Sequence, residues 1–396
     1  MNSGKRWIVG RLEDGARANK PRARARARGR ANPRLRQILS SCLFCFAPNE
    51  RPVRERETPS GSGMAMAACR ATTRLAIVGD VHDAWDPVVD ARALDLLQPD
   101  LVLFTGDFGN KNVDVVSSIS TLNFPKAAIL GNHDCWFPSG SPEHTRSCNL
   151  ERDPIQVQLD LLGNSHVGYK RLDFPQLKIS VVGGRPGSWG GLHMHNKTKR
   201  FFGASNMDQS SDLISKAALG APEDNFLLLL AHNGPTGLGS KYNDICGKDW
   251  DLRGGDHGDR DLRNAISQVK KKRKVPLVVF GHMHKGLQFG VSERNMIVVG
   301  EDKSVYLNAA VVPRIRKVSS SNADEVSLET QLANSNLYEC YEAEPLPSEI
   351  PSERNFTLVE MEDGELKKIS EVWIKVDESQ ASIGEETQLY PRARTV

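Results

Sequence analysis

Five short segments of the chain each join an apolar run to side chains that can bind a metal ion. His282 and His284 follow the run "VPLVVF" and a glycine, Gly281. The same order of apolar run, small residue, then Asp, Asn or His occurs four more times. The donors gathered in this way are Asp80, His82, Asp107, Asn132, His232, His282 and His284. Imidazoles, carboxylates and one amide without a thiolate suit Mn, Fe or Zn rather than a structural zinc site or a calcium cage.

The number of donors indicates two ions. With one carboxylate shared between them, these side chains supply four ligands to each ion. Two ions about 3.5–4 Å apart can clamp the attacking and leaving oxygens of an in-line displacement. The pattern therefore predicts a dinuclear metal site, filled by divalent or trivalent Mn, Fe or Zn, that hydrolyses an ester.

The elements that must position these donors are predicted by the runs themselves. The apolar runs read as buried strands, and they alternate with helical patterns such as "DPVVDARALDLL" (86–97) and "DPIQVQLDLLG" (153–163). This rhythm predicts βαβ units with parallel strands. Ligands bind beyond the carboxyl ends of such strands, and glycine there permits a sharp corner and a close approach of backbone to the site. Residues 304–312 and 355–376 read as later strands, with Asp363-Gly364 as a hairpin turn.

Composition limits the remaining possibilities. The chain has 396 residues, 39% hydrophobic content and a net charge of +3, with no apolar run near the roughly 18 residues of a membrane span. Residues 1–71 are rich in Arg, Pro and Gly and predict a disordered basic extension. We interpret it as a transit segment or as an upstream stretch before Met64, rather than as an arm for nucleic acid. Seven scattered cysteines indicate a reducing compartment, and we expect a chloroplast location, with the cytoplasm as the alternative.

The segments "GDVHD", "GDFGN", "GNHD", "AHNG" and "GHMH", in this order, resemble the five motifs of the calcineurin-like metallophosphoesterase superfamily. The segments "LAHNGPTGLGS" and "VVGGRPGSW" are similar to those of a plant and cyanobacterial branch of this superfamily. The resemblance implies an α/β fold, a two-sheet sandwich with a βαβαβ core flanked by helices. This domain would span residues 72–376, with a polar loop at about 317–354 and a C-terminal tail at 377–396.

The resemblance also implies a role for each donor. One metal would take Asp80, His82, Asp107 and His284, and the other Asp107, Asn132, His232 and His282, so that Asp107 bridges. A hydroxide activated by the two ions would attack the phosphate, and His133 would assist the leaving group. Many members carry an acid three residues after the bridging aspartate, where this chain has Asn110. An amide can orient His133 but stabilises its charged form less well.

Three further residues are candidate substrate contacts: Arg185, Asp256 and His257. For Arg185 the alternative is a tight turn with a solvated arginine. For Asp256 and His257 the alternative is a polar insertion that ends in a helix cap. The predicted function is hydrolysis of a phosphate mono- or diester on a small substrate, without a membrane or nucleic acid as partner. The alternatives are a nuclease that uses the same site and a scaffold that keeps the fold without catalysis.

Overall fold

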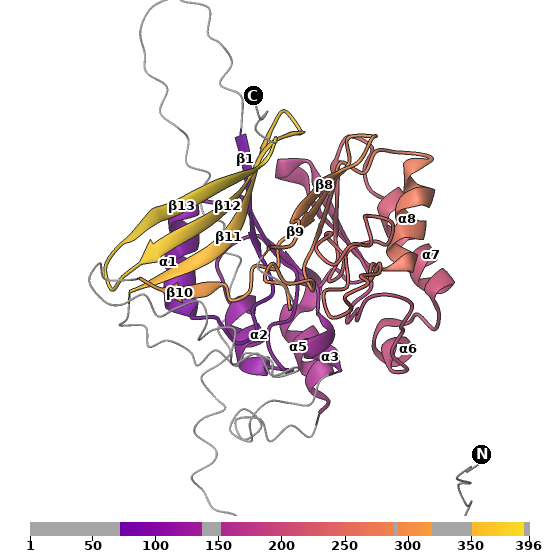
Figure 1. Ribbon diagram of the computed structural model, residues 1–396, viewed down its shortest axis with the longest axis horizontal. Helices are drawn as coiled ribbons and strands as arrows, with labels where there is room; N and C mark the ends of the chain where they lie inside the picture. The colour runs from indigo at the N-terminus through magenta and orange to yellow at the C-terminus, as the bar shows by residue number, and fades with distance from the viewer. Residues whose placement is uncertain (1–71, 137–151, 289–291, 319–350, 392–396) are drawn as a thin grey trace, which may run out of the picture. The chain divides into compact units, whose positions relative to one another are not determined.

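The computed structural model describes residues 72–136, 152–288, 292–318 and 351–391 (Figure 1). The predicted basic extension at 1–71 lies outside them, as does most of the polar loop predicted at 317–354. The described residues all fall within one unit of the chain, Ala67–Val396.

The first sheet begins with the three strands that carry the first three motifs. Strands β1, β2 and β3 pair in parallel in that order. On the other side of β1 the sheet continues antiparallel through β11, β12 and β13, and β10 pairs with β11. The seven strands of this sheet in the described residues are β1 Thr72–Val78, β2 Leu101–Phe104, β3 Lys126–Ala128, β10 Ile315–Lys317, β11 Ser352–Glu362, β12 Glu365–Val376 and β13 Ala381–Tyr390.

The second sheet carries the last two motifs. Its order is β4-β5-β6-β7-β9-β8, parallel from β5 to β9 and closed at each edge by an antiparallel strand. The first two strands of this sheet, β4 and β5, pair antiparallel. The strands are β4 Arg171–Phe174, β5 Ile179–Gly183, β6 Phe226–Leu230, β7 Leu277–Phe280, β8 Ile297–Val299 and β9 Val305–Asn308.

Helices cover the outer faces of the two sheets, and an apolar layer lies between them (Figure 1). Ile77 and Leu103 of the first sheet share the inner layer with Leu228 and Val279 of the second. The predicted two-sheet α/β sandwich is confirmed. Its helices are α1 Pro87–Leu97, α2 Val113–Ser120, α3 Asn132–Cys135, α5 Pro154–Leu162, α6 Thr198–Phe202, α7 Met207–Leu219 and α8 Arg260–Lys270, with short 3-10 turns at η2 Gly163–Ser165 and η3 Pro175–Leu177.

Local sequence explains where the first helices start. Asp86 caps α1, its carboxylate accepting from the backbone N–H groups of Val88 and Val89, and a proline opens the helix. The same Asp-Pro arrangement starts α5. Helix α1 packs on the strands β12 and β13. Each of these helices therefore begins at the residue that the sequence indicates.

The C-terminal tail expected at 377–396 is wrong for half of its length. Residues 381–390 form β13, which pairs antiparallel with β12. The segment "ASIGEETQLY" lacks the regular alternation of apolar and polar residues that marks a strand, and it is exposed along most of its length. Its place is decided by the edge of β12, which offers backbone hydrogen bonds to a neighbouring segment.

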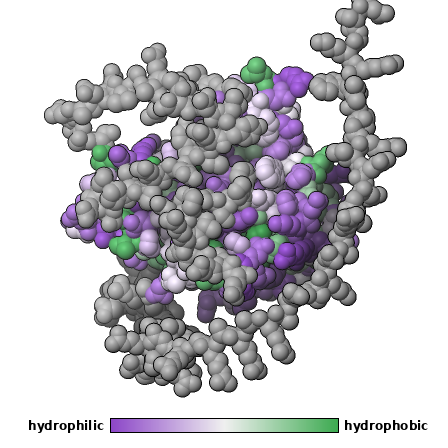
Figure 2. Space-filling model, turned by 90° about the horizontal axis from the view of Figure 1, so that it is seen from below, coloured by the Kyte–Doolittle hydropathy of each residue, from purple (hydrophilic) through white to green (hydrophobic). Residues whose placement is uncertain are grey.

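The surface is described in part by Figure 2, which shows one face of the molecule. Hydrophobic residues on that face occur as separate spots among hydrophilic ones. Within the described residues, no helix is both long enough and apolar enough to cross a membrane.

Candidate metal centre

The predicted donors meet at one place, but they come from two sheets rather than one. Asp80 and His82 follow β1, Asp107 follows β2, and Asn132 opens α3 just after β3. The histidines of the last two motifs follow β6 and β7 of the other sheet. Direct bonds join the two sets, because the N–H of His282 donates to Asp80 Oδ2 at 2.8 Å. The packing of sheet on sheet therefore assembles the site.

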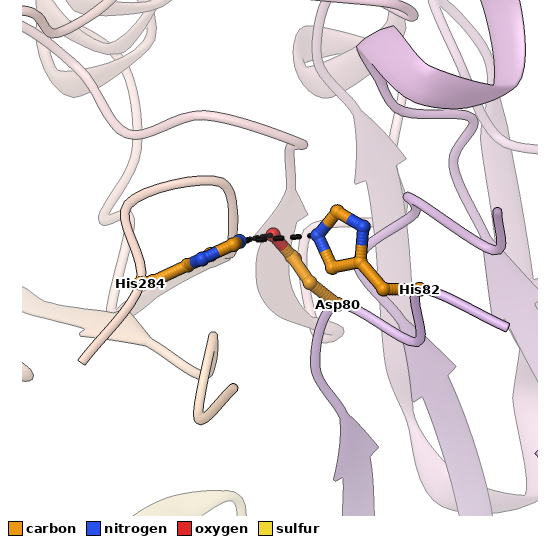
Figure 3. A group of neighbouring side chains, drawn as sticks. All are labelled: Asp80, His82 and His284. Atoms are coloured by element: carbon orange, nitrogen blue, oxygen red, sulfur yellow. Dashed lines mark hydrogen bonds and ion pairs between the residues drawn. The ribbon is translucent and has the colours of Figure 1, made fainter. Parts of the chain in front are cut away.

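One group of donors consists of Asp80, His82 and His284, whose potential ligand atoms lie within 4.8 Å of one another. The Nε2 atoms of His82 and His284 are 3.1 Å apart, and His284 Nε2 lies 3.7 Å from Asp80 Oδ2. Figure 3 shows the two imidazoles directed toward one another, with the carboxylate of Asp80 beside them. This convergence of lone pairs is the arrangement that a shared cation satisfies.

A second group consists of Asp107, His232 and His282. The amide of Asn132 joins it, since its Oδ1 lies 2.8 Å from His232 Nε2. His232 Nδ1 donates to the backbone carbonyl of Thr105 at 2.8 Å. That bond fixes the tautomer and ring orientation, and directs the Nε2 atom of His232 toward the donor group.

Asp107 lies between the two groups and offers a different oxygen to each. Its Oδ2 is 3.8 Å from His82 Nε2, and its Oδ1 is 3.4 Å from His232 Nε2. The carboxylate is buried. This is the geometry that a bridging ligand between two cations requires.

Burial sets the protonation of the donors. It lowers the pKa of His82 to about 3 and that of His284 to about 4, so both imidazoles are neutral at pH 7. It raises the pKa of Asp80 to about 7. Burial also lowers the pKa of His232, but Asp107 and Asp80 outweigh it and raise that pKa to about 10. His232 therefore holds a proton that a metal ion must displace.

The small residues before the donors act mainly by leaving room. A Cβ on Gly281 would lie 2.1 Å from Asp80 Oδ1, and one on Gly131 would lie 2.1 Å from Asp107 Oδ1. Gly106 makes its own corner with φ of 105°, and three donors also lie in the left-handed region, with φ of 42° at His82, 48° at Asp107 and 68° at His282. Such strain in residues other than glycine is typical of functional sites.

Asp134 holds two of the donor loops together. Its carboxylate accepts from the N–H of Phe108 at 2.8 Å and from the N–H of Gly131 at 2.7 Å. It thus ties the loop of Asp107 to the loop of Asn132. Asp83 has a similar local task, since Asn112 donates to it at 2.6 Å.

His133 lies at the edge of the centre, with its ring centroid 4.8 Å from that of His82. Its Nδ1 lies 2.7 Å from Asn110 Oδ1, and its backbone N–H donates to Asp107 Oδ1 at 2.9 Å. Asn110 is thus in the place from which it can orient the imidazole. Burial lowers the pKa of His133.

Arg185 is not placed as a substrate contact. Its side chain is only 2% exposed. Its guanidinium donates to Asp259 at 2.7 Å, to Asp261 at 3.0 Å and to the carbonyl of His193 at 2.6 Å. The geometry therefore opposes both the predicted phosphate contact and a solvated turn. The signal for this ion pair was the "DRD" triplet at 259–261, but nothing in the sequence links it to Arg185.

Asp256 and His257 have different surroundings. The carboxylate of Asp256 accepts from the N–H of Gly237 at 2.6 Å and of Gly258 at 2.8 Å, and so shapes its own loop. His257 lies beside the centre, with its ring centroid 6.0 Å from that of His282. Of the three predicted substrate contacts, His257 is therefore the one whose side chain lies next to a metal donor, His282.

The donor set fits two metal ions. Imidazoles, buried carboxylates and an amide oxygen meet in overlapping groups of three or more. Buried carboxylates are costly unless they are paired or coordinate a metal. Fold and site together define a two-sheet α/β protein with a candidate site for two metal ions at the strand ends.

Residues 73–286, more than half of the chain, match the calcineurin-like phosphoesterases. The chain belongs to this family of metal-dependent phosphoesterases. A comparison with curated proteins found no match.

Two solved structures are similar to the chain. A dimetal phosphatase from Danio rerio has 11% identity and a TM-score of 0.39, with 78% of this chain and 98% of that one covered. A conserved protein from Streptococcus pneumoniae, described as a predicted phosphoesterase, has 10% identity and a TM-score of 0.27, with 80% of this chain and 98% of that one covered. Because both scores are low, the family assignment depends on the sequence match.

Proposed function

We propose that the protein hydrolyses a phosphate ester at a centre of two metal ions. One ion is held by Asp80, His82, Asp107 and His284. The other is held by Asp107, Asn132, His232 and His282. The observation that carries the proposal is the position of Asp107, whose two oxygens face His82 and His232 at 3.8 and 3.4 Å.

The work divides between the ions and the chain. When bound, Mn, Fe or Zn ions polarise the phosphoryl group and activate water. The neutral imidazoles of His82 and His284 keep their lone pairs for an ion at neutral pH. His133 gives the departing oxygen a proton, and Asn110 orients its ring through the bond at Nδ1.

The proposal is tested by Asp107→Asn with Asp95→Asn as the control. Asp95 is an exposed aspartate of α1. An amide in place of the bridging carboxylate removes charge where two cations meet. We expect the Asp107 variant to lose at least one metal per chain and most of its hydrolysis of a chromogenic phosphoester, whereas the control keeps both. Full metal occupancy by elemental analysis, together with a near-normal rate, would contradict the dinuclear assignment.

A second experiment separates the alternatives. A panel of mono- and diesters, with DNA and RNA included, is offered to the wild-type protein. Cleavage of nucleic acid in preference to every small ester would favour a nuclease. Two bound metals without turnover of any ester would favour a scaffold.

We also infer membership of the plant and cyanobacterial branch and a chloroplast location. The sequence segment "LAHNGPTGLGS" supports the branch. The Arg-rich, acid-poor stretch near the start of the chain supports the location. Imaging of the full chain with a C-terminal fluorescent tag in plant cells tests the location. Signal outside plastids would contradict it.

A further inference from the structure

A row of aromatic rings runs outward from the metal centre. The rings of His282 and His257 are nearly parallel, with an interplanar angle of 24° and centroids 6.0 Å apart. Trp250 then meets His257 edge to face, with centroids 4.8 Å apart. Trp250 is therefore two ring contacts away from a metal donor.

The middle ring of this row is held by a second segment that also carries a tryptophan. His257 Nε2 donates to the carbonyl of Trp189 at 2.8 Å, and the N–H of Gly191 donates to the carbonyl of His257 at 2.8 Å. A Cβ on Gly190, between them, would lie 2.4 Å from the His257 ring. The segments of Trp189 and Trp250 thus meet at His257.

The loop of Trp250 is also fixed to the loop of the last motif. The buried Arg294 donates to the carbonyl of His284 at 2.8 Å and to that of Gly247 at 2.7 Å. It also pairs with Asp249, next to Trp250, at 3.2 Å. Arg294 therefore links the backbone of the donor His284 to Asp249, the residue before Trp250.

Both tryptophans are partly open to solvent. Trp250 is 42% exposed and Trp189 is 39% exposed. Large aromatic rings that remain accessible beside a functional site supply stacking area at little cost in conformational entropy. The other two rings of the row, His257 and His282, are half-buried.

We propose that Trp250, supported by His257 and flanked by Trp189, is a specificity-determining residue that selects phosphate esters bearing a planar aromatic group. The phosphate would lie at the metal centre and the aromatic group against the indole of Trp250. Stacking of an aromatic ring on an aromatic side chain corresponds to about three- to tenfold in a rate or binding constant. This inference rests on the proposed phosphoesterase function.

Two matched pairs of substrates test the inference without a change in leaving-group acidity. The first pair is benzyl phosphate and cyclohexylmethyl phosphate, and the second is a nucleoside 5′-monophosphate and ribose 5-phosphate. We expect the wild-type protein with Mn²⁺ to favour the aromatic member by about three- to tenfold in kcat/KM. A preference in the second pair alone identifies a nucleobase, and one in the first pair identifies a smaller aryl group. No preference in either pair overturns the inference.

Three variants assign the preference to the indole. Trp250→Ala should bring the ratio within each pair close to one, and Trp250→Phe should keep most of it. Leu252→Ala is the matched control, because Leu252 lies in the same loop and is 84% exposed. It should keep both the rate and the ratio. If Trp250→Ala folds poorly, Trp250→Leu takes its place, because leucine keeps a large apolar side chain without an aromatic ring. A ratio that stays at the wild-type value in Trp250→Leu contradicts the assignment.

Failure of the proposed function would be recognised separately. If no ester is hydrolysed although metals are bound, benzylphosphonate and cyclohexylmethylphosphonate are compared by calorimetry. Tighter binding of the aromatic phosphonate, lost in Trp250→Ala, supports the aromatic selection without catalysis. Equal binding overturns it.

Discussion

The Nδ1 atom of His133 lies 2.7 Å from the Oδ1 atom of Asn110. The amide oxygen accepts a hydrogen bond from Nδ1–H and fixes the plane of the imidazole, which leaves Nε2 as the atom available to a substrate. An amide carries no charge, so it favours the imidazolium less than a carboxylate would. His133 therefore has the orientation for a leaving-group acid but only weak support for its charged form.

His133→Asn should separate two kinds of ester. General acid catalysis contributes about 10²–10⁴-fold and matters most when the leaving group is poor. We expect an alkyl phosphate to be slowed severely and a nitrophenyl phosphate much less, with both metals still bound. Rates on the two esters and elemental analysis check this. Equal losses on both esters with metals retained would make His133 a positioning group.

Gly281→Ala should weaken metal binding. Its Cβ would lie 2.1 Å from Asp80 Oδ1 and 2.6 Å from Thr105 Oγ1, so the carboxylate must move from its place. Gly286→Ala is the control in the same loop, since its nearest neighbour is 4.0 Å away. We expect Gly281→Ala to bind the metal at least tenfold more weakly. Gly286→Ala should bind it with unchanged affinity. Metal affinity measured by chelator competition decides, and equal affinities would contradict the packing argument.

Metal binding should release protons and tighten with pH. In the ion-free protein the raised pKa of His232, about 10, stabilises the fold fully below about pH 6.5 and progressively less toward pH 10. The metal needs the deprotonated imidazole, so affinity should rise about tenfold per pH unit below that pKa. Chelator competition with Mn²⁺ at pH 7 and pH 8, and calorimetry in two buffers, measure this. A pH-independent affinity without proton release would contradict it.

Arg185→Met should lower stability rather than weaken substrate binding. Removing the guanidinium leaves Asp259 and Asp261 buried without their partner, which costs about 3–5 kcal/mol of unfolding free energy. Arg253→Met is the control, because its pair with Asp251 is on the surface, where solvent screens the two charges and the pair contributes little to stability. Denaturant unfolding gives both values. Unchanged stability with a raised KM would restore Arg185 as a phosphate contact.

The sequence could predict every part whose signal is local. The apolar runs predicted β1, β2, β6 and β7, and Asp-Pro predicted the start of α1 and α5. Each donor is adjacent to its strand, so the spacing alone indicated seven metal-competent side chains. These predictions succeed because the residues that cause the structure are neighbours in the chain.

Tertiary structure decided whatever depends on residues far apart in the chain. Packing of sheet on sheet brings His282 to Asp80, 202 residues away, and gives Asp107 a histidine at each oxygen. Arg185 pairs with carboxylates that lie 74 and 76 residues later in the chain. The mostly exposed β13 is positioned by its backbone pairing with the edge of β12. These contacts depend on burial and on hydrogen-bonding partners supplied by distant segments, and no local pattern records them.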